Sequence, residues 1–415
     1  MGFRHIPSTQ LKAEHAAQQS YFQTVCALRT PPKTLVTSLW TTQILERKKR
    51  SMLRFIRRFA ALLLMRTVKF FYHDCKVFNA KFNRKFRNKA TILEVHDGDL
   101  VFPDGAYAIF LIFQPNDFPW YVRNALCALK ENGINVFAVV NHRLSQERLC
   151  ELKAHSSRIL IRDNSGFDIG GYRDATLFLH QSAKPKRVIY LNDSVYFFKD
   201  GLSDLMKRLS QSDRDIVGSF ENWEFNYHIQ SFCFSVSDHV FNSEKFVEFW
   251  HDYLPVNSRL WAINRGEIGL SRVMVPVARS IETIYDPNKL RAGLNDLPND
   301  NLVAMNSCLP RGLRIRAEEF KNTPKTVLVD DFCTQITVRS QIHTGGFLYT
   351  KFLQCPMMKR DLFYRLQFGI YEIEQHLMDI GDNTHINDIL TDMRKKWPGN
   401  HLPLLKRLLF NIGII

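Results

Sequence analysis

The chain has 415 residues, of which 45% are hydrophobic and 12% aromatic, so it can form one large or two medium domains around a packed core. This aromatic share argues against an intrinsically disordered chain. None of the eight cysteines forms a C-x-x-C pair, which argues against zinc ribbons and thioredoxin-like chemistry and is typical of buried thiols in a reducing compartment. The first residues predict neither a secretory nor a myristoylation signal.

The formal net charge of +15 is concentrated in one segment. Between Arg47 and Lys89, fifteen Lys or Arg residues accompany one acid, Asp74, for a net charge of +14. Residues 1–46 carry four basic and two acidic groups, so the remaining 326 residues sum to about −1. A nucleic-acid-binding domain would place its basic residues around the working cleft, so we expect no nucleic-acid partner.

Residues 47–98 are predicted to form a basic amphipathic helical segment. At about 100° per residue, its basic and apolar side chains fall on opposite halves of a helix. The basic half contains Arg54, Arg57, Arg58, Arg66, Lys69 and Lys76, and the apolar half contains Met52, Ile56, Phe59, Leu63 and Phe70. The uncharged run Phe59–Met65 is far shorter than the roughly 20 residues of a membrane span. The pattern favours a helix lying in the interface of an anionic membrane, and the alternative is a surface helix packed on its own domain.

From residue 99 onward, apolar runs typical of buried strands alternate with helical patterns. The predicted strands are Ala108–Phe113, Asn135–Val140, Arg158–Arg162, Arg187–Leu191 and Asp215–Phe220. The first predicted helix is capped by Asp117, runs to about Asn132 and is ended by Gly133. The other predicted helices are Ser145–Ala154, Tyr172–Gln181 and Leu202–Leu209. This alternation predicts parallel, right-handed βαβ units in an α/β fold.

After residue 220 the pattern becomes less regular. We expect an extended stretch at Tyr227–Val236, a capped helix at Ser243–Tyr253, an irregular region at 254–325, and helices over Phe352–Met378 and Ile386–Leu409. The chain therefore divides into residues 1–46, which give little signal, the basic segment 47–98, a main domain at 99–350 and a helical C-terminal region at 351–415.

The stretch from Arg162 to Asp174 reads R-D-N-S-G-F-D-I-G-G-Y-R-D, a glycine-rich turn that opens a helix. Glycines allow positive φ and close backbone approach, and helix amides just beyond Gly171 would meet a phosphate or ribose. Asp168 would accept hydrogen bonds from sugar or ribose hydroxyls. The alternative is a tight turn in which the glycines only satisfy geometry.

The predicted strand Arg187–Leu191 delivers Asn192, Asp193 and Ser194 at its carboxyl end, where open α/β sheets bind ligands. A second acid, Asp200, follows nearby. Mg²⁺ or Mn²⁺ typically binds through one or two carboxylates plus substrate phosphates, and a diphosphate leaving group needs its charge neutralised. The alternative for Asp193 is an N-cap or turn residue.

These motifs, N-x-G-x-D-I-G-x-Y and L-N-D-S-x-Y, resemble the rhamnan synthesis protein F family of bacterial polysaccharide glycosyltransferases. Further blocks similar to that family follow in the same order: Tyr227–Phe232, Phe246–Trp250, Gly266–Ser271 and Cys355–Asp361. The resemblance covers about residues 105–375.

The resemblance implies a GT-A-like α/β fold with a mostly parallel sheet, a nucleotide-binding half and an acceptor half. It implies transfer of a sugar such as rhamnose, from a nucleotide-sugar donor such as dTDP-rhamnose, to a glycan or lipid-linked glycan acceptor in surface polysaccharide or lipopolysaccharide assembly. The expected location is cytoplasmic, at the inner face of the bacterial cell membrane.

By the same resemblance, the donor-site residues are Asn164, Gly166, Asp168, Gly170, Tyr172 and Asn192. Asp193 would face the diphosphate as a metal ligand. Enzymes of this kind usually carry a D-x-D motif, whereas this chain has Asn192-Asp193-Ser194 with a single acid, so a requirement for Mg²⁺ or Mn²⁺ stays open.

A catalytic base near the acceptor hydroxyl must be a carboxylate or an imidazole. Glu267, which heads an apolar helix after an irregular loop, is the preferred candidate and His228 the second; Glu221 and Glu224 are further candidates. His343 is a candidate metal or diphosphate ligand, with an ordinary loop histidine as the alternative.

The sequence lacks the motifs that are typical of other nucleotide-binding and hydrolytic enzyme classes. No G-x-x-x-x-G-K-[ST] or G-x-S-x-G occurs, and Gln114-Pro115-Asn116 follows the first strand where a dinucleotide-binding oxidoreductase would carry G-x-G-x-x-G. The main rival is a non-catalytic GT-A-like protein that binds a glycan or a partner at the membrane.

Overall fold

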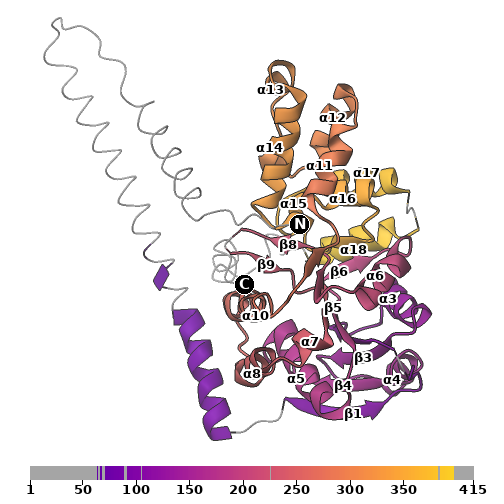
Figure 1. Cartoon of the computed structure of the whole chain (residues 1–415), viewed down its shortest axis with the longest axis vertical. Helices are drawn as coiled ribbons and strands as arrows, with labels where there is room; N and C mark the ends of the chain where they lie inside the picture. Colours follow the sequence, from indigo (N-terminus) through magenta and orange to yellow (C-terminus); the bar gives the residue numbers. More distant parts are fainter. Residues whose placement is uncertain are drawn as a thin grey trace, which may run out of the picture. The chain divides into compact units, whose positions relative to one another are not determined.

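An eight-stranded sheet organises the described part of the chain (Figure 1). The computed structural model describes residues 63, 66–67, 71–87, 91–103, 105–224, 226–381 and 384–396. The chain divides into two units, residues 1–67 and 68–415. The predicted helix at residues 47–62 and the end of the predicted helix at 397–409 lie outside the described residues.

The sheet has the order β1-β4-β3-β2-β5-β10-β7-β11. Its strands are β1 (Ile92–Asp97), β2 (Tyr107–Ile112), β3 (Asn135–Val140), β4 (Arg158–Arg162), β5 (Arg187–Asn192), β7 (Ile216–Gly218), β10 (Cys233–Ser237) and β11 (Ile281–Thr283). Only β1 and β10 run antiparallel to the other strands of this sheet. The predicted mostly parallel α/β sheet is therefore confirmed.

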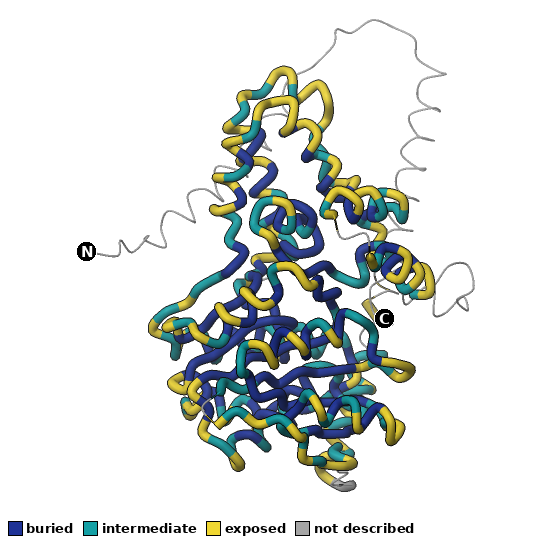
Figure 2. Tube along the Cα trace, turned by 90° about the vertical axis from the view of Figure 1, so that its right-hand side faces the viewer, coloured by how far each residue is buried: buried dark blue, intermediate teal, exposed yellow. Residues whose placement is uncertain are grey.

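Helices cover both faces of the sheet. On one face lie α3 (Trp120–Glu131), α4 (Gln146–Lys153) and α6 (Leu202–Gln211); on the other lie α5 (Phe167–Ser182), α7 (Asp238–Phe241), α8 (Glu244–Asp252) and α10 (Ile268–Met274). Side chains of a strand alternate between the two faces, so Phe110 joins the first core while Ile109 and Leu111 join the second. In Figure 2 the buried residues gather in this layered part.

Two short helices precede β11: α9 (Arg259–Trp261) and the π-helix η2 (Ala262–Glu267). A helical region follows β11, and its members are α11 (Pro287–Asn295), α12 (Asn299–Met305), η3 (Asn306–Cys308), η4 (Arg311–Leu313), α13 (Ala317–Asn322), α14 (Lys325–Thr337), α15 (Gln341–Thr344), α16 (Gly346–Leu353), α17 (Ile370–Ile380) and α18 (Ile386–Lys396). Two small sheets pair β6 (Val195–Phe197) with β12 (Met357–Lys359), and β8 (Glu221–Asn222) with β9 (His228–Ile229). The expected helical C-terminal region is confirmed.

The structure corrects several expected boundaries. Residues 92–97, placed in the basic segment, form strand β1 beside β4. The region 254–325 is largely helical rather than irregular, because short elements are held by packing rather than by a strong periodic pattern. Within 352–378, residues Met357–Lys359 form a strand paired with β6. The cap of α3 is Pro119, whose ring pre-sets φ, and not Asp117.

Residues 71–82 form a helix that continues in the π-helix η1 (Asn83–Arg87). Arg84 ties it to the domain by donating to the carbonyl oxygens of His251 and Asp252 at the end of α8. His73 Nδ1 lies 2.9 Å from Ser258 Oγ. No helix among the described residues has the length and apolarity that crossing a membrane requires.

Candidate functional site

The glycine-rich motif starts helix α5 earlier than the sequence predicts. The helix begins at Phe167, not at Tyr172, and Gly166 precedes it with φ of 74°. The amide of Gly166 donates to Asn257 Oδ1 at 2.6 Å, and a Cβ on Gly166 would lie 2.7 Å from Pro255 Cβ. The amides beyond Gly171 therefore lie inside the helix, because its first turn forms five residues earlier.

Gly170 and Gly171 let α5 approach its neighbours closely. A Cβ on Gly170 would lie 2.1 Å from the carbonyl oxygen of Ser165, and one on Gly171 would lie 2.2 Å from Leu111 Cδ1 of β2. Packing alone therefore explains why these two positions are glycine. The donor-site roles of Gly166 and Gly170 stay predictions.

A buried arginine holds the turn before α5. Arg162, fully buried at the end of β4, donates to Asp174 Oδ2 at 2.9 Å, to Asn141 Oδ1 at 2.9 Å and to the carbonyl oxygen of Ser165 at 2.8 Å. Asn141 in turn donates to Asn164 Oδ1 at 2.9 Å. Asn164 is thus positioned by a network that links β4, α5 and the loop after β3.

The structure brings Asp168 of α5 to Asn192 of β5. Asn192 Nδ2 donates to Asp168 Oδ2 at 3.0 Å. Burial raises the pKa of Asp168 to about 7, repulsion from Asp193 and Glu267 adds to the rise, and the Lys359 cation opposes it. Asp168 is therefore a carboxyl group that titrates near neutral pH, which is a property common at functional sites.

Tyr172 lies next to this carboxyl group, since Asp168 and Asn192 are among the groups that act on its hydroxyl. Its side chain is fully buried, and its hydroxyl donates to the carbonyl oxygen of Ser231 at 3.1 Å. Burial raises its pKa well above the usual value. Its predicted donor-site role stays a prediction.

Asp193 lies directly after β5, at the predicted strand end. Its Oδ2 accepts hydrogen bonds from the amide of Phe113 at 2.9 Å and from Gln114 Nε2 at 2.5 Å. Arg360 donates to its carbonyl oxygen at 2.7 Å. Asp193 is 7% exposed, and no hydrogen bond among the described residues engages its Oδ1.

Lys359 is a site residue that sequence reasoning missed. The pairing of β12 with β6 carries it to the strand end, where its Nζ donates to Ser194 Oγ at 3.0 Å and lies 4.0 Å from the centroid of the Phe232 ring. Burial lowers its pKa to about 8, against the attraction of Asp361 and Glu267. The signal available in the sequence was the Lys-Arg-Asp run in the Cys355–Asp361 block.

The two candidate bases lie together. His228 Nε2 is 4.0 Å from Glu267 Oε2, and the two side chains are 3% and 28% exposed. His228 Nδ1 lies 2.8 Å from the carbonyl oxygen of Asn226, which fixes Nδ1 as the donor and leaves Nε2 facing Glu267. Glu221 of β8 is engaged elsewhere, since it accepts hydrogen bonds from Trp223 Nε1 at 2.9 Å and Thr283 Oγ1 at 3.3 Å.

His343 is buried and engaged at both ring nitrogens. Nε2 lies 2.9 Å from Asp361 Oδ1, and Nδ1 lies 2.7 Å from Ser340 Oγ. Burial lowers its pKa to about 4, although Asp361 opposes the shift. No cluster of three or more potential metal-ligating side chains occurs among the described residues. The metal-ligand roles expected for His343 and Asp193 both stay predictions.

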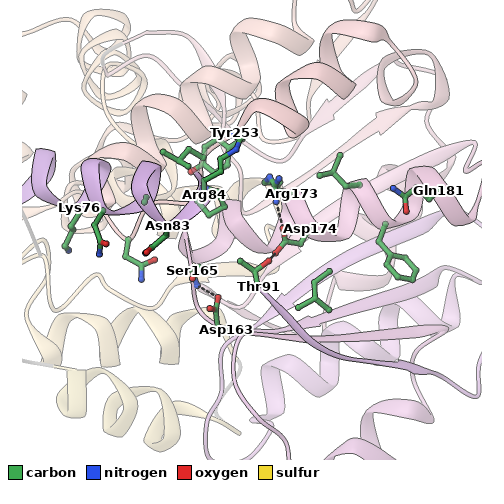
Figure 3. Close-up of a pocket in the computed structure, with 18 residues that line it drawn as sticks. Lys76, Asn83, Arg84, Thr91, Asp163, Ser165, Arg173, Asp174, Gln181 and Tyr253 are labelled. Atoms are coloured by element: carbon green, nitrogen blue, oxygen red, sulfur yellow. Dashed lines mark hydrogen bonds and ion pairs between the residues drawn. The ribbon is translucent and has the colours of Figure 1, made fainter. Parts of the chain in front are cut away.

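A cavity of about 710 Å³ lies beside the motif (Figure 3). Its lining includes Lys76, Arg84, Asp163, Arg173 and Asp174, and it is bounded by residues 76–84 on one side and by α5 on the other. None of the predicted donor-site residues lines it. The cavity is thus distinct from the cluster around Asp168, Asp193, Glu267 and Lys359.

The fold and this cluster define an α/β protein with a polar site at the carboxyl end of its parallel strands. A family model described as rhamnan synthesis protein F matches residues 136–297, a range that contains Asp168, Asp193, His228 and Glu267. The resemblance read from the sequence is thereby confirmed over that range, and it supports a glycosyltransferase in general.

A curated protein matches part of the chain. The chain is 30% identical over 200 residues to the uncharacterized protein y4gN of Sinorhizobium fredii, which covers 47% of this chain and 52% of that protein. The chain thus spans about half the length of this curated relative.

Solved structures that resemble the chain in part include two glycosyltransferase-like proteins. The glycosyltransferase GlyE of Streptococcus pneumoniae TIGR4 is 11% identical, with a TM-score of 0.28 over 57% of this chain and 64% of that one. A putative nucleotide-diphospho-sugar transferase from Desulfovibrio desulfuricans G20 is 10% identical, with a TM-score of 0.25 over 57% of this chain and 97% of that one.

Proposed function

We propose that this protein transfers a sugar from a nucleotide-sugar donor to a growing glycan. The observation that carries the proposal is the meeting of Glu267 and His228 at 4.0 Å, beside a carboxyl group, Asp168, and an ammonium group, Lys359, whose pKa values both lie near neutrality. These groups come from four separate elements and converge on the sheet edge at which α/β proteins bind nucleotides.

In this proposal, the donor lies against the end of β5. Asn164, Asp168 and Asn192 contact its ribose or sugar hydroxyls. Lys359 stabilises the charge that develops on the leaving diphosphate. A divalent cation such as Mg²⁺ or Mn²⁺ would be held by Asp193 together with the diphosphate and would supply further charge neutralisation.

The proposed base is Glu267, which takes the proton from the attacking hydroxyl of the acceptor. His228, with its Nε2 4.0 Å from Oε2, lies beside the carboxylate and limits the positions that it can take. A base must lie within hydrogen-bond reach of that hydroxyl, and the 28% exposure of Glu267 leaves its carboxylate accessible from the site.

We further propose a rhamnose donor and an acceptor glycan of surface polysaccharide or lipopolysaccharide, at the cytoplasmic face of the membrane. The membrane part is supported by the helix at residues 71–82. Its polar residues His73 and Lys76 face the domain, whereas Phe78 is 72% exposed. Apolar residues on the outer face and flanking lysines are typical of helices that lie in a membrane interface.

The test uses the purified full chain and a panel of nucleotide sugars, with and without Mn²⁺. A donor raises the melting temperature because ligand binding stabilises the native state by RT ln(1 + [L]/Kd). Donor hydrolysis or transfer should be lost in Asp193→Ala and kept in Asp200→Ala, since Asp200 is exposed. Binding without turnover would support the rival, a non-catalytic glycan- or partner-binding protein. No nucleotide-sugar binding at millimolar concentration would overturn the proposal.

A further inference from the structure

A second cavity, of about 960 Å³, lies between the helix at residues 71–87 and the helices α8, η2 and α10. Its floor is apolar and includes Phe249, Leu254, Trp261 and Val273. No residue of the cluster around Asp168 lines it. We call this cavity the basic groove.

The rim of the basic groove carries a strong excess of positive charge. The basic groove is lined by six basic residues and by two acids, Glu248 and Asp252, for a net charge of +4. The basic residues are Lys81, Arg84, Lys85, Lys245, Arg265 and Arg272. Lys245 and Arg272 are exposed, and neither forms an ion pair within the part of the chain that the structure describes. The charges of Lys245 and Arg272 are therefore not neutralised by an acidic side chain among these residues.

We propose that the basic groove binds an anionic lipid, with its phosphate at the rim and its hydrocarbon chain on the apolar floor. An anionic polysaccharide or nucleotide would match the charge but leave the apolar floor unused. An apolar peptide would match the floor but leave a net charge of +4 uncompensated. A phosphate-bearing amphiphile satisfies both parts, since basic residues attract lipid phosphates and apolar surface binds the chain.

The basic groove adjoins the proposed catalytic site across a single helical segment. Arg265, Gly269 and Arg272 line the groove, whereas Glu267, from the same segment, reaches His228 instead. A lipid phosphate at the rim would thus lie roughly one helix diameter, about 10 Å, from Glu267. This placement suits a lipid that carries the acceptor glycan, and that last step rests on the proposed transferase function.

Binding is tested without any sugar donor, so its outcome is separate from that of the proposed activity. The probes are octyl, decyl and dodecyl phosphate below their micelle concentrations, titrated calorimetrically into the full chain. Each buried methylene contributes about 0.8 kcal/mol, so the Kd should tighten about fourfold per methylene until the floor is filled. The double variant Lys245→Glu with Arg272→Glu should bind dodecyl phosphate at least tenfold more weakly.

The matched control is Lys130→Glu with Lys207→Glu, which reverses two exposed charges on α3 and α6, on the other face of the sheet. It should bind dodecyl phosphate with unchanged Kd, and thermal melts establish that both double variants are folded. Equal binding of dodecyl maltoside, whose head group is neutral, would overturn the proposal. So would a Kd independent of chain length and matched by inorganic phosphate, or equal weakening in the control variant.

Discussion

At the scale of single residues, Asp168 links stability to function. Its pKa is raised from the usual 3.8 to about 7, so the native state binds the proton more tightly than the unfolded state does. Its effect on stability therefore becomes unfavourable as the pH rises from about 4 through 7. We predict that Asp168→Asn raises the free energy of unfolding by about 1–2 kcal/mol at pH 8 and has little effect at pH 4.

Urea unfolding at the two pH values measures this difference, and Asp200→Asn, at an exposed position, is the control. Donor turnover should fall in Asp168→Asn despite the gain in stability. An equal stability change at pH 4 and pH 8 would show that the carboxyl group does not titrate as described.

A second residue-scale prediction concerns the pair Glu267 and His228. Removing a catalytic base typically lowers kcat by 10²–10⁴, so Glu267→Gln should lower kcat by that order with little change in KM for the donor. His228→Asn should give a smaller loss, because its proposed role is to orient Glu267. Glu221→Gln is the matched control, and equal losses in it and in Glu267→Gln would remove Glu267 from the proposed role.

The sequence predicted part of this site and missed part of it. Asp168, Asn192 and Asp193 were found because they follow predicted strands and belong to recognisable motifs. Glu267 and His228 were predicted separately, and only the fold shows that they meet at 4.0 Å. Lys359 was missed because its place depends on the pairing of β12 with β6, which joins residues more than 160 positions apart. No local pattern encodes that pairing.

At the scale of elements, the contact of α5 with β2 and with its own preceding turn depends on glycine. A Cβ on Gly170 would lie 2.1 Å from the backbone oxygen of Ser165, which cannot move without displacing the motif. We predict that Gly170→Ala lowers the free energy of unfolding by about 1–3 kcal/mol, the usual cost of overpacking. Gly346→Ala is the control, since nothing lies within 4 Å of its Cβ. Chemical denaturation measures both, and equal stabilities would contradict the prediction.

The helices and strands that are most deeply buried were predicted best from the sequence. The predicted strands that became β2 to β5 agree with the structure within one residue at each end, because strands buried on both faces read as continuous apolar runs. Residues 254–325 were predicted to be irregular, although they contain α9 to α13, because elements of three to nine residues show too few turns for a periodic pattern. The strand β1 was missed because it directly follows the basic run 47–89 and was included in the same segment.

At the scale of the whole molecule, the positive charge lies in a different part of the chain from the proposed transferase site. The segment 47–89 carries +14, whereas the rest beyond residue 89 is nearly neutral, so attraction to an anionic surface comes from one end of the chain. The outward position of Phe78 adds an apolar contribution to that attraction. Electrostatic and apolar terms respond differently to salt, which makes them separable by experiment.

We therefore predict that the full chain sediments with vesicles containing anionic phosphatidylglycerol, that binding weakens as salt rises, and that deleting residues 47–89 abolishes it. Phe78→Ser should weaken binding roughly fivefold even at high salt, because it removes apolar surface rather than charge. Val303→Ser on α12, a position that is 48% exposed, is the control and should bind as the unaltered chain does. Unchanged sedimentation after the deletion would exclude this segment as the anchor, and equal effects of the two serine variants would exclude Phe78 as a specific contact.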